Sequence, residues 1–122
     1  LDPDTQALKQ LKNEVCGTNI EPLEADITQT TPIKASSVDL LYLSTVFHGF
    51  SKDQIAGFQK EAARVLKQGG ILAIIEIKKE VTPFGPPMEI RFSPEELKRI
   101  LSLTPKNLMD VGAYFYMQMF EK

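Results

Sequence analysis

The sequence is poor in several residue types that would indicate particular classes of protein. It has one cysteine, Cys16, so no disulfide framework can form within the chain, which fits a reducing cytoplasm. With only one histidine besides, a structural zinc site is not expected, because such sites usually have four Cys or His ligands. No stretch approaches about 20 apolar residues, so no membrane-spanning helix is predicted.

Charge of one sign is not in excess either. The 14 Lys and Arg residues face 16 Asp and Glu residues, for a net charge of −2. Nucleic-acid binding would require a clustered basic face and a membrane surface would require a polybasic run. No nucleic-acid or membrane partner is therefore expected. The 122 residues, 43% of them hydrophobic, suit a single domain over residues 1–122.

Three segments carry the start signals of helices. Asp2 before Pro3 is expected at the N-cap of a helix that ends before Gly17. Ser51 and Ser93 each begin a capping box, in which a serine and a Gln or Glu three residues later bond each other's backbone N–H groups. Apolar residues at helical spacing follow both serines.

Strands are predicted over residues 20–25, 38–47 and 71–77, and as a hairpin around Gly112. Segments 38–47 and 71–77 are mostly apolar, as expected for strands covered on both faces. Strands and helices thus alternate, which predicts an α/β sandwich with a mostly parallel sheet. The C-terminal hairpin would supply an antiparallel strand.

The segment EAARVLKQGG followed by ILAIIE resembles class I S-adenosylmethionine-dependent methyltransferases of type 11, where E-x-x-RVLKPGG leads into the fifth strand. SSVDLLYLSTVFHGF resembles the fourth strand of that family, NIEPLEADI the third, LDPDTQAL the end of the second, and GAYFYMQMFEK the closing strand. The resemblance covers nearly all of the chain in the right order. It implies the C-terminal two-thirds of a Rossmann-like three-layer sandwich with strand order 3-2-1-4-5-7-6.

The resemblance also implies S-adenosylmethionine as the cofactor and assigns residues to it. Asp2 would bind the ribose hydroxyls, and Asp26, followed by Ile27, would contact the adenine. Ser44 and Thr45 would lie at the carboxyl end of the fourth strand, where open α/β sheets bind their ligands. On the residues alone, Asp2 could equally be an N-cap and Asp26 a turn residue.

His48 follows the same strand and is the candidate catalytic residue. A base would help if the methyl acceptor must lose a proton, and histidine titrates near neutral pH. The alternative is a loop histidine bonded to the backbone. Residues 84–88 are expected to be either a substrate-facing cover or a rigid proline-bound connector.

One feature of the family has no counterpart in the sequence. The first strand and its glycine-rich turn, roughly G-x-G-x-G, would precede Leu1, and the chain begins there without an initiator methionine, as a fragment or a processed chain would. A third strand without its neighbours would have unpaired edges. We therefore predict that residues 20–25 move beside 38–47 or pair with another chain, giving a homo-oligomer by strand exchange.

The sequence predicts methyl transfer to a small-molecule acceptor, performed by the intact parent domain. The alternative is a noncatalytic, methyltransferase-like fragment that acts as an oligomerising or regulatory module. A dehydrogenase-like nucleotide-binding protein would share the acid after strand two, but the RVLKQGG and YFYMQMFEK segments disfavour it.

Overall fold

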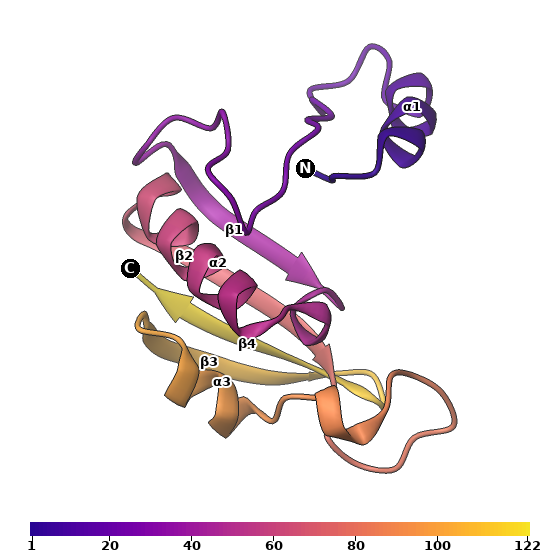
Figure 1. Ribbon diagram of the computed structural model, residues 1–122, viewed down its shortest axis with the longest axis vertical. Coiled ribbons are helices and arrows are strands. Elements are labelled where there is room, and N and C mark those ends of the chain that lie inside the picture. Colours follow the sequence, from indigo (N-terminus) through magenta and orange to yellow (C-terminus); the bar gives the residue numbers. More distant parts are fainter.

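The computed structural model describes residues 1–122 and contains one four-stranded sheet (Figure 1). Its elements in chain order are α1 (Thr5–Glu14), β1 (Val38–Ser44), α2 (Lys52–Val65), β2 (Leu66–Ile77), α3 (Pro94–Ile100), β3 (Thr104–Val111) and β4 (Phe115–Glu121), with 3₁₀ turns at Phe47–Gly49 and Met88–Ile90. The helix after Ser51 thus ends at Val65, and residues 66–70 belong to β2.

The strand order is β1-β2-β4-β3, with β1 parallel to β2 and β4 antiparallel to both β2 and β3. Three strands therefore run in one direction and β4 runs against them. This confirms the predicted α/β fold with a mostly parallel sheet and an antiparallel C-terminal strand. The order equals the 4-5-7-6 portion of the order that the resemblance implied.

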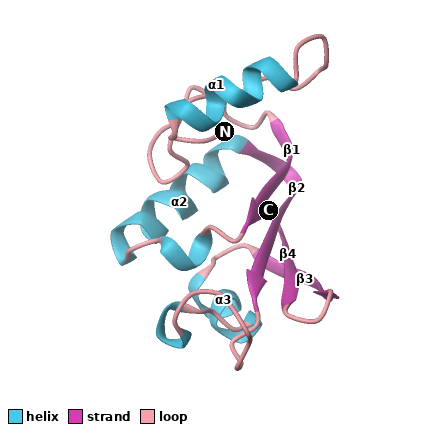
Figure 2. Ribbon diagram, turned by 90° about the vertical axis from the view of Figure 1, so that its right-hand side faces the viewer, coloured by secondary structure: helices cyan, strands magenta, loops and turns pink.

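Helices α2 and α3 cover one face of this sheet (Figure 2). Both predicted capping boxes are present, Ser51 with Gln54 and Ser93 with Glu96. The core lies between these helices and the sheet, and its fully buried side chains include Phe58, Leu72 and Phe120. Burial of such side chains is the dominant stabilising contribution to the fold.

Strand β1 is covered on one face only, so the prediction of burial on both faces is wrong for this strand. Leu43 is buried, whereas Leu40 is 57% exposed and Tyr42 is 55% exposed. Alternate strand residues face opposite sides of a sheet, and no helix lies against the side of Leu40 and Tyr42 (Figure 2). The apolar sequence of β1 therefore leaves an uncovered apolar surface.

Residues 20–25 do not form a strand beside β1, and that prediction is wrong. Asp2 and Glu24 form one isolated parallel bridge, in which the Asp2 N–H donates to the Leu23 carbonyl at 3.1 Å and the Ala25 N–H donates to the Asp2 carbonyl at 3.3 Å. Pro22 has no N–H to extend a ladder. Pairing of this segment with another chain remains a prediction.

The N-cap of α1 is Asp4, not Asp2. The Asp4 carboxylate accepts the N–H groups of Gln6 and Ala7, at 2.9 and 3.2 Å. Asp2 instead accepts the N–H of Asp4 through Oδ1, at 2.8 Å. Asp4 reaches the second and third helical N–H groups, the usual partners of a cap. Asp2 therefore does not have the N-cap role that the sequence predicted for it.

Candidate functional site

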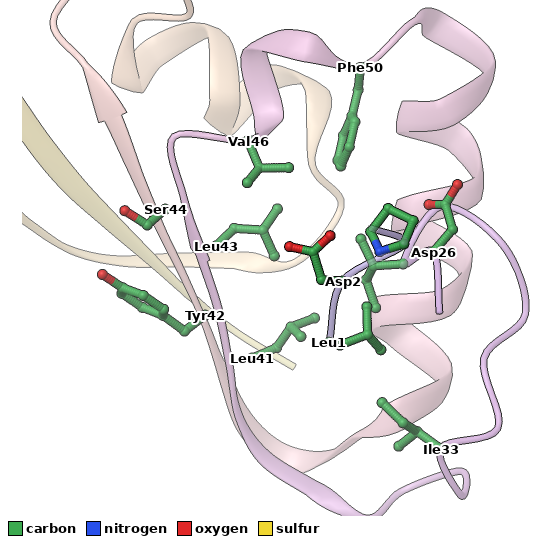
Figure 3. A pocket seen from close by; sticks show the side chains of 12 residues that line it. Leu1, Asp2, Asp26, Ile33, Leu41, Tyr42, Leu43, Ser44, Val46 and Phe50 are labelled. Carbon is green, nitrogen blue, oxygen red and sulfur yellow. The ribbon is translucent and has the colours of Figure 1, made fainter. Parts of the chain in front are cut away.

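A cleft of about 470 Å³ lies between the N-terminal segment and β1 (Figure 3). Its volume lies within the range of about 300–1,000 Å³ that is typical of small-molecule sites, and it combines an apolar lining with a few polar groups. The lining consists of Leu1, Asp2, Pro3, Asp26, Ile27, Ile33, Leu41, Tyr42, Leu43, Ser44, Val46 and Phe50. The β1 residues come from the carboxyl half of that strand, where open α/β sheets bind ligands.

Four of the six predicted site residues line this one cleft. Asp2, Asp26 and Ile27 contribute from the N-terminal segment and Ser44 from β1, so the cleft joins distant parts of the sequence. In Figure 3 the Asp2 carboxylate points toward β1. Thr45 is not among the lining residues. His48 also lies outside the lining, in the 3₁₀ turn after β1.

The Asp26 carboxylate has a local structural role. Its Oδ1 accepts the backbone N–H of Thr28 at 2.8 Å and the Thr28 hydroxyl at 2.7 Å. This is the turn interaction that the sequence offered as an alternative for Asp26. Oδ2 of Asp26 has no hydrogen-bond partner within the chain, as is also true of Oδ2 of Asp2. Each carboxylate therefore keeps one oxygen for a donor on a ligand.

Thr45 has a strained backbone at the end of β1. Its φ of +56° lies in the left-handed region, which is unusual for a β-branched residue. Its N–H donates to the Ile75 carbonyl of β2 at 2.8 Å, and its hydroxyl donates to the Ser44 carbonyl at 2.7 Å. These bonds hold the chain in the turn that leads from β1 to His48. Strain of this kind concentrates at functional sites.

His48 is paired with Glu76, at the end of β2. Nδ1 of His48 lies 2.8 Å from Oε2 of Glu76, and the His48 backbone N–H donates to Oε1 at 3.1 Å. Glu76 is 1% exposed, whereas the His48 side chain is 21% exposed. When Nδ1 carries the proton and donates to Glu76, Nε2 is left as an acceptor.

Sequence reasoning did not assign a role to Glu76. The signal was available, because Glu76 is the only charged residue of the otherwise apolar stretch 71–77, near the end of β2. The carboxyl ends of parallel β1 and β2 meet at the same edge of the sheet, with Ser44 opposite Ile75. The apolar residues Val46 and Phe50 were also missed as lining, because aromatic and branched residues are common in any core.

A second buried carboxylate, that of Glu61 in α2, bonds Thr31 of the N-terminal segment. Its hydrogen bond with Arg64 is the main cause that lowers its pKa to about 2, and hydrogen bonds from Thr31 lower it further against the opposing effect of burial. Glu61 is therefore ionised at any ordinary pH. The E-x-x-R portion of the EAARVLKQGG segment thus forms an ion pair rather than part of the cleft lining.

The fold and the cleft together define an α/β protein with a ligand site at the carboxyl end of a parallel strand. The chain belongs to a family of methyltransferases: the family described as "Methyltransferase domain" matches residues 1–74, more than half of the chain. No curated protein matches it.

Solved structures share the fold. A SAM-dependent methyltransferase from Aquifex aeolicus superposes with a TM-score of 0.80 at 29% identity, over 92% of this chain and 60% of that protein. The N-methyltransferase NodS from Bradyrhizobium japonicum WM9, in complex with S-adenosyl-L-homocysteine, has a TM-score of 0.68 at 15% identity, over 98% of this chain and 63% of that protein. The chain thus spans less than two-thirds of the length of these relatives.

The cofactor that this family implies is S-adenosylmethionine, and the cleft fits its nucleoside part. The ribose hydroxyls and the adenine amino group are hydrogen-bond donors, which suit the two carboxylates of Asp2 and Asp26. The side chains of Ile27, Val46 and Phe50 suit the apolar faces of a base. None of the seven glycines of the chain lines the cleft, so the glycine-rich turn of the family has no counterpart here.

Proposed function

We propose that the domain to which this chain belongs transfers a methyl group from S-adenosylmethionine to a small-molecule acceptor in the cytoplasm. The observation that carries this proposal is the cleft of a methyltransferase-family chain, whose lining combines the carboxylates of Asp2 and Asp26 with mostly apolar side chains. When bound, the cofactor supplies a methyl group that is already activated. The protein then needs chiefly to bind and orient the reactants, which by itself can lower a barrier by about 7–11 kcal/mol.

In this proposal the residues of the cleft bind the nucleoside. Asp2 accepts the ribose hydroxyls and Asp26 accepts the adenine amino group, each through its free Oδ2. Ile27 packs on the base, and Ser44 forms the end of the cleft nearest the acceptor. Thr45, which does not line the cleft, fixes the turn that follows Ser44. The apolar side chains exclude water, which strengthens the polar contacts made inside.

His48 is proposed as the base that receives a proton from the acceptor, at Nε2. Glu76 then acts as a positioning residue, because its carboxylate accepts both the Nδ1 proton and the backbone N–H of His48. This pairing fixes the ring orientation and stabilises the imidazolium that forms. Segment 84–88, which follows β2, is proposed as the cover that faces the acceptor.

The test is isothermal titration of this chain with S-adenosylhomocysteine. Loss of a hydrogen bond to a charged group costs about 10- to 100-fold in affinity, so D2N and D26N should each weaken binding by that factor. D39N is the matched control, because the Asp39 carboxylate is 81% exposed and lies outside the cleft. Equal affinity for D26N and D39N would contradict the proposed site, and no binding by the folded wild-type chain would contradict cofactor binding by this chain.

A second candidate function, an oligomerising or regulatory module, is favoured by the uncovered part of the sheet. β1 pairs with β2 along one edge only. The pairing register places Leu40, Tyr42 and Ile71 on the face without helices. Unpaired edges and exposed apolar faces promote association between chains.

Mass measurement by light scattering tests the second candidate. A dimer that becomes a monomer in L40K, but not in the control I20K, would support it. Leu40 is 57% exposed on the face without helices and does not line the cleft, and Ile20 is 54% exposed in the N-terminal segment. A wild-type monomer at high concentration would contradict it. The two candidates are independent, because neither Leu40→Lys nor Ile20→Lys changes a residue that lines the cleft.

A further inference from the structure

One wall of the cleft is formed by a segment without regular secondary structure. Residues 26–33 supply Asp26, Ile27 and Ile33 to the lining, yet they form only turns and bends. A segment of this kind has no ladder of backbone hydrogen bonds to fix it. Side chains from elsewhere must therefore hold it if the wall is to keep its shape.

Glu61 of α2 bonds the middle of this segment. Its Oε1 accepts the backbone N–H of Thr31 at 2.8 Å and the Thr31 hydroxyl at 2.7 Å. Glu61 is 3% exposed and Thr31 is 5% exposed, so water does not replace these bonds. Hydrogen bonds to an ionised acceptor are stronger than those between neutral groups.

Arg64, one helical turn later, bonds the carbonyl groups of the same segment. Its Nη2 donates to the Thr31 carbonyl at 3.1 Å and to the Ile33 carbonyl at 2.7 Å. Arg64 also donates to both oxygens of Glu61, from Nε at 2.9 Å and from Nη2 at 2.6 Å. The backbone of residues 31–33 is thus held by a carboxylate at its N–H and by a guanidinium at its carbonyls.

A close backbone contact holds the other end of the segment against α2. A Cβ atom at Gly57 would lie 2.1 Å from the Thr28 carbonyl oxygen, so only glycine permits this approach. Thr28 in turn donates two hydrogen bonds to Asp26. Gly57 and Glu61 lie four residues apart and share one face of α2. The helix therefore contacts the segment near Asp26 and again near Ile33.

We propose that Glu61 and Arg64 are positioning residues that hold the wall formed by residues 26–33, and so set the affinity of the cleft for a nucleoside. The statement about the ligand rests on the proposed function. The E-x-x-R segment by which the chain resembles methyltransferases then contributes to ligand binding at a distance, although neither residue lines the cleft.

The test compares E61Q with E96Q. Glu96 of α3 is a matched control, because its carboxylate also accepts a backbone N–H, that of Ser93 at 2.7 Å, and pairs with a cation, Lys79 at 2.7 Å. In E61Q the glutamine amide replaces an oxygen that accepts from Arg64, so two donors face each other. We expect faster hydrogen exchange at Thr31 and about 10-fold weaker binding of S-adenosylhomocysteine, with neither change in E96Q.

A milder pair of variants keeps the test decisive if E61Q does not fold. T31V removes the hydroxyl that bonds Glu61 and should weaken binding several-fold, whereas T31S keeps the hydroxyl and should restore the wild-type affinity. A residue with only a structural role would lower the melting temperature without this rescue of affinity.

The outcomes separate this inference from the proposed function. If the wild-type chain binds and Thr31 exchange rises in E61Q without a change in affinity, the inference is overturned and the proposed function stands. If the wild-type chain does not bind, the proposed function fails for this chain. The exchange at Thr31 then decides alone whether Glu61 holds the wall, and exchange equal to that of E96Q overturns it.

Discussion

The residues before β1 and the residues from β1 onward differ in how they are held. Eleven of the twelve residues in the core cluster lie in the sheet unit, residues 38–122, and only Ile27 comes from the N-terminal segment, residues 1–37. In Figure 1 α1 stands away from the sheet, joined to it by an extended stretch of chain. Stability therefore resides in the sheet unit. The proposed ligand carboxylates, Asp2 and Asp26, reside in the N-terminal segment.

The cleft therefore joins two walls that are held with unequal strength. The β1 wall is fixed by the parallel ladder with β2, whereas the opposite wall depends on one isolated bridge and on the contacts from α2. Local opening costs less free energy where few apolar contacts are buried. We expect local opening of the N-terminal segment to be more frequent than unfolding of the sheet unit.

The largest effect should follow from F58A. Phe58 is fully buried, and its ring lies 5.9 Å from those of both Phe47 and Phe50. Removal of such a side chain costs about 3–5 kcal/mol, which is a large fraction of the stability of a small domain. Urea unfolding should show this loss. I20S, at an exposed position of the N-terminal segment, should change the stability by no more than about 0.5 kcal/mol. Similar losses of stability in both variants would contradict the conclusion that stability resides in the sheet unit.

The sheet unit could be predicted from the sequence because its signals are local and agree with one another. The capping boxes at Ser51 and Ser93 and the turn at Gly112, with its φ of +69°, depend on neighbouring residues and were found where they were expected. The N-terminal segment could not, because strand pairing depends on a neighbour rather than on propensity. Residues 20–25 have strand-like residues, but only Asp2 pairs with them.

The candidate site divides in the same way. Asp26 could be found from the family pattern, but its Asx turn and its attachment through Thr28 to Gly57 could not. The partners Glu76 and Glu61 lie 28 and 30 residues from His48 and Thr31, and no local pattern links them. Residues that act through tertiary contacts are therefore invisible to periodicity and spacing.

G57A should have the next largest effect, because it separates the weaker wall from its support. A methyl group 2.1 Å from the Thr28 carbonyl must push the segment or the helix aside, and overpacking of this kind costs about 1–3 kcal/mol. The control is G49A, since a Cβ at Gly49 would meet nothing within 4 Å. Thermal unfolding should show a lower melting temperature for G57A only. Equal melting temperatures would show that residues 26–33 can move away from α2 without a loss in the free energy of unfolding.

The pH dependence of stability should come mainly from Glu61. Its pKa is about 2 in the folded chain, against an ordinary value of 4.5, so its stabilisation is fully present above about pH 4.5 and is lost as the pH falls toward 2. Because the Arg64 side chain is 32% exposed and partly screened, we expect about 1–3 kcal/mol rather than the full value of the shift.

Urea unfolding at pH 7, 5 and 3 measures this contribution. Wild type and E61Q should differ at pH 7 and converge toward low pH, because protonated Glu61 resembles glutamine. D39N serves as the control, since Asp39 is 81% exposed and pairs with Lys67 at the surface. It should differ from wild type by less than about 1 kcal/mol at every pH. A constant difference between wild type and E61Q would contradict an ionic role.

The smallest global effect should follow from D4A, although its local effect should be clear. The Asp4 carboxylate caps α1, and replacing a cap by alanine costs about 1 kcal/mol of helix stability. Because α1 stands away from the sheet, this loss should speed hydrogen exchange within Thr5–Glu14 and leave exchange in β2 unchanged. If exchange in β2 rose in step with that in α1, the two regions would unfold as one unit. The contrast between a stable sheet unit and a separately held N-terminal segment would then be wrong.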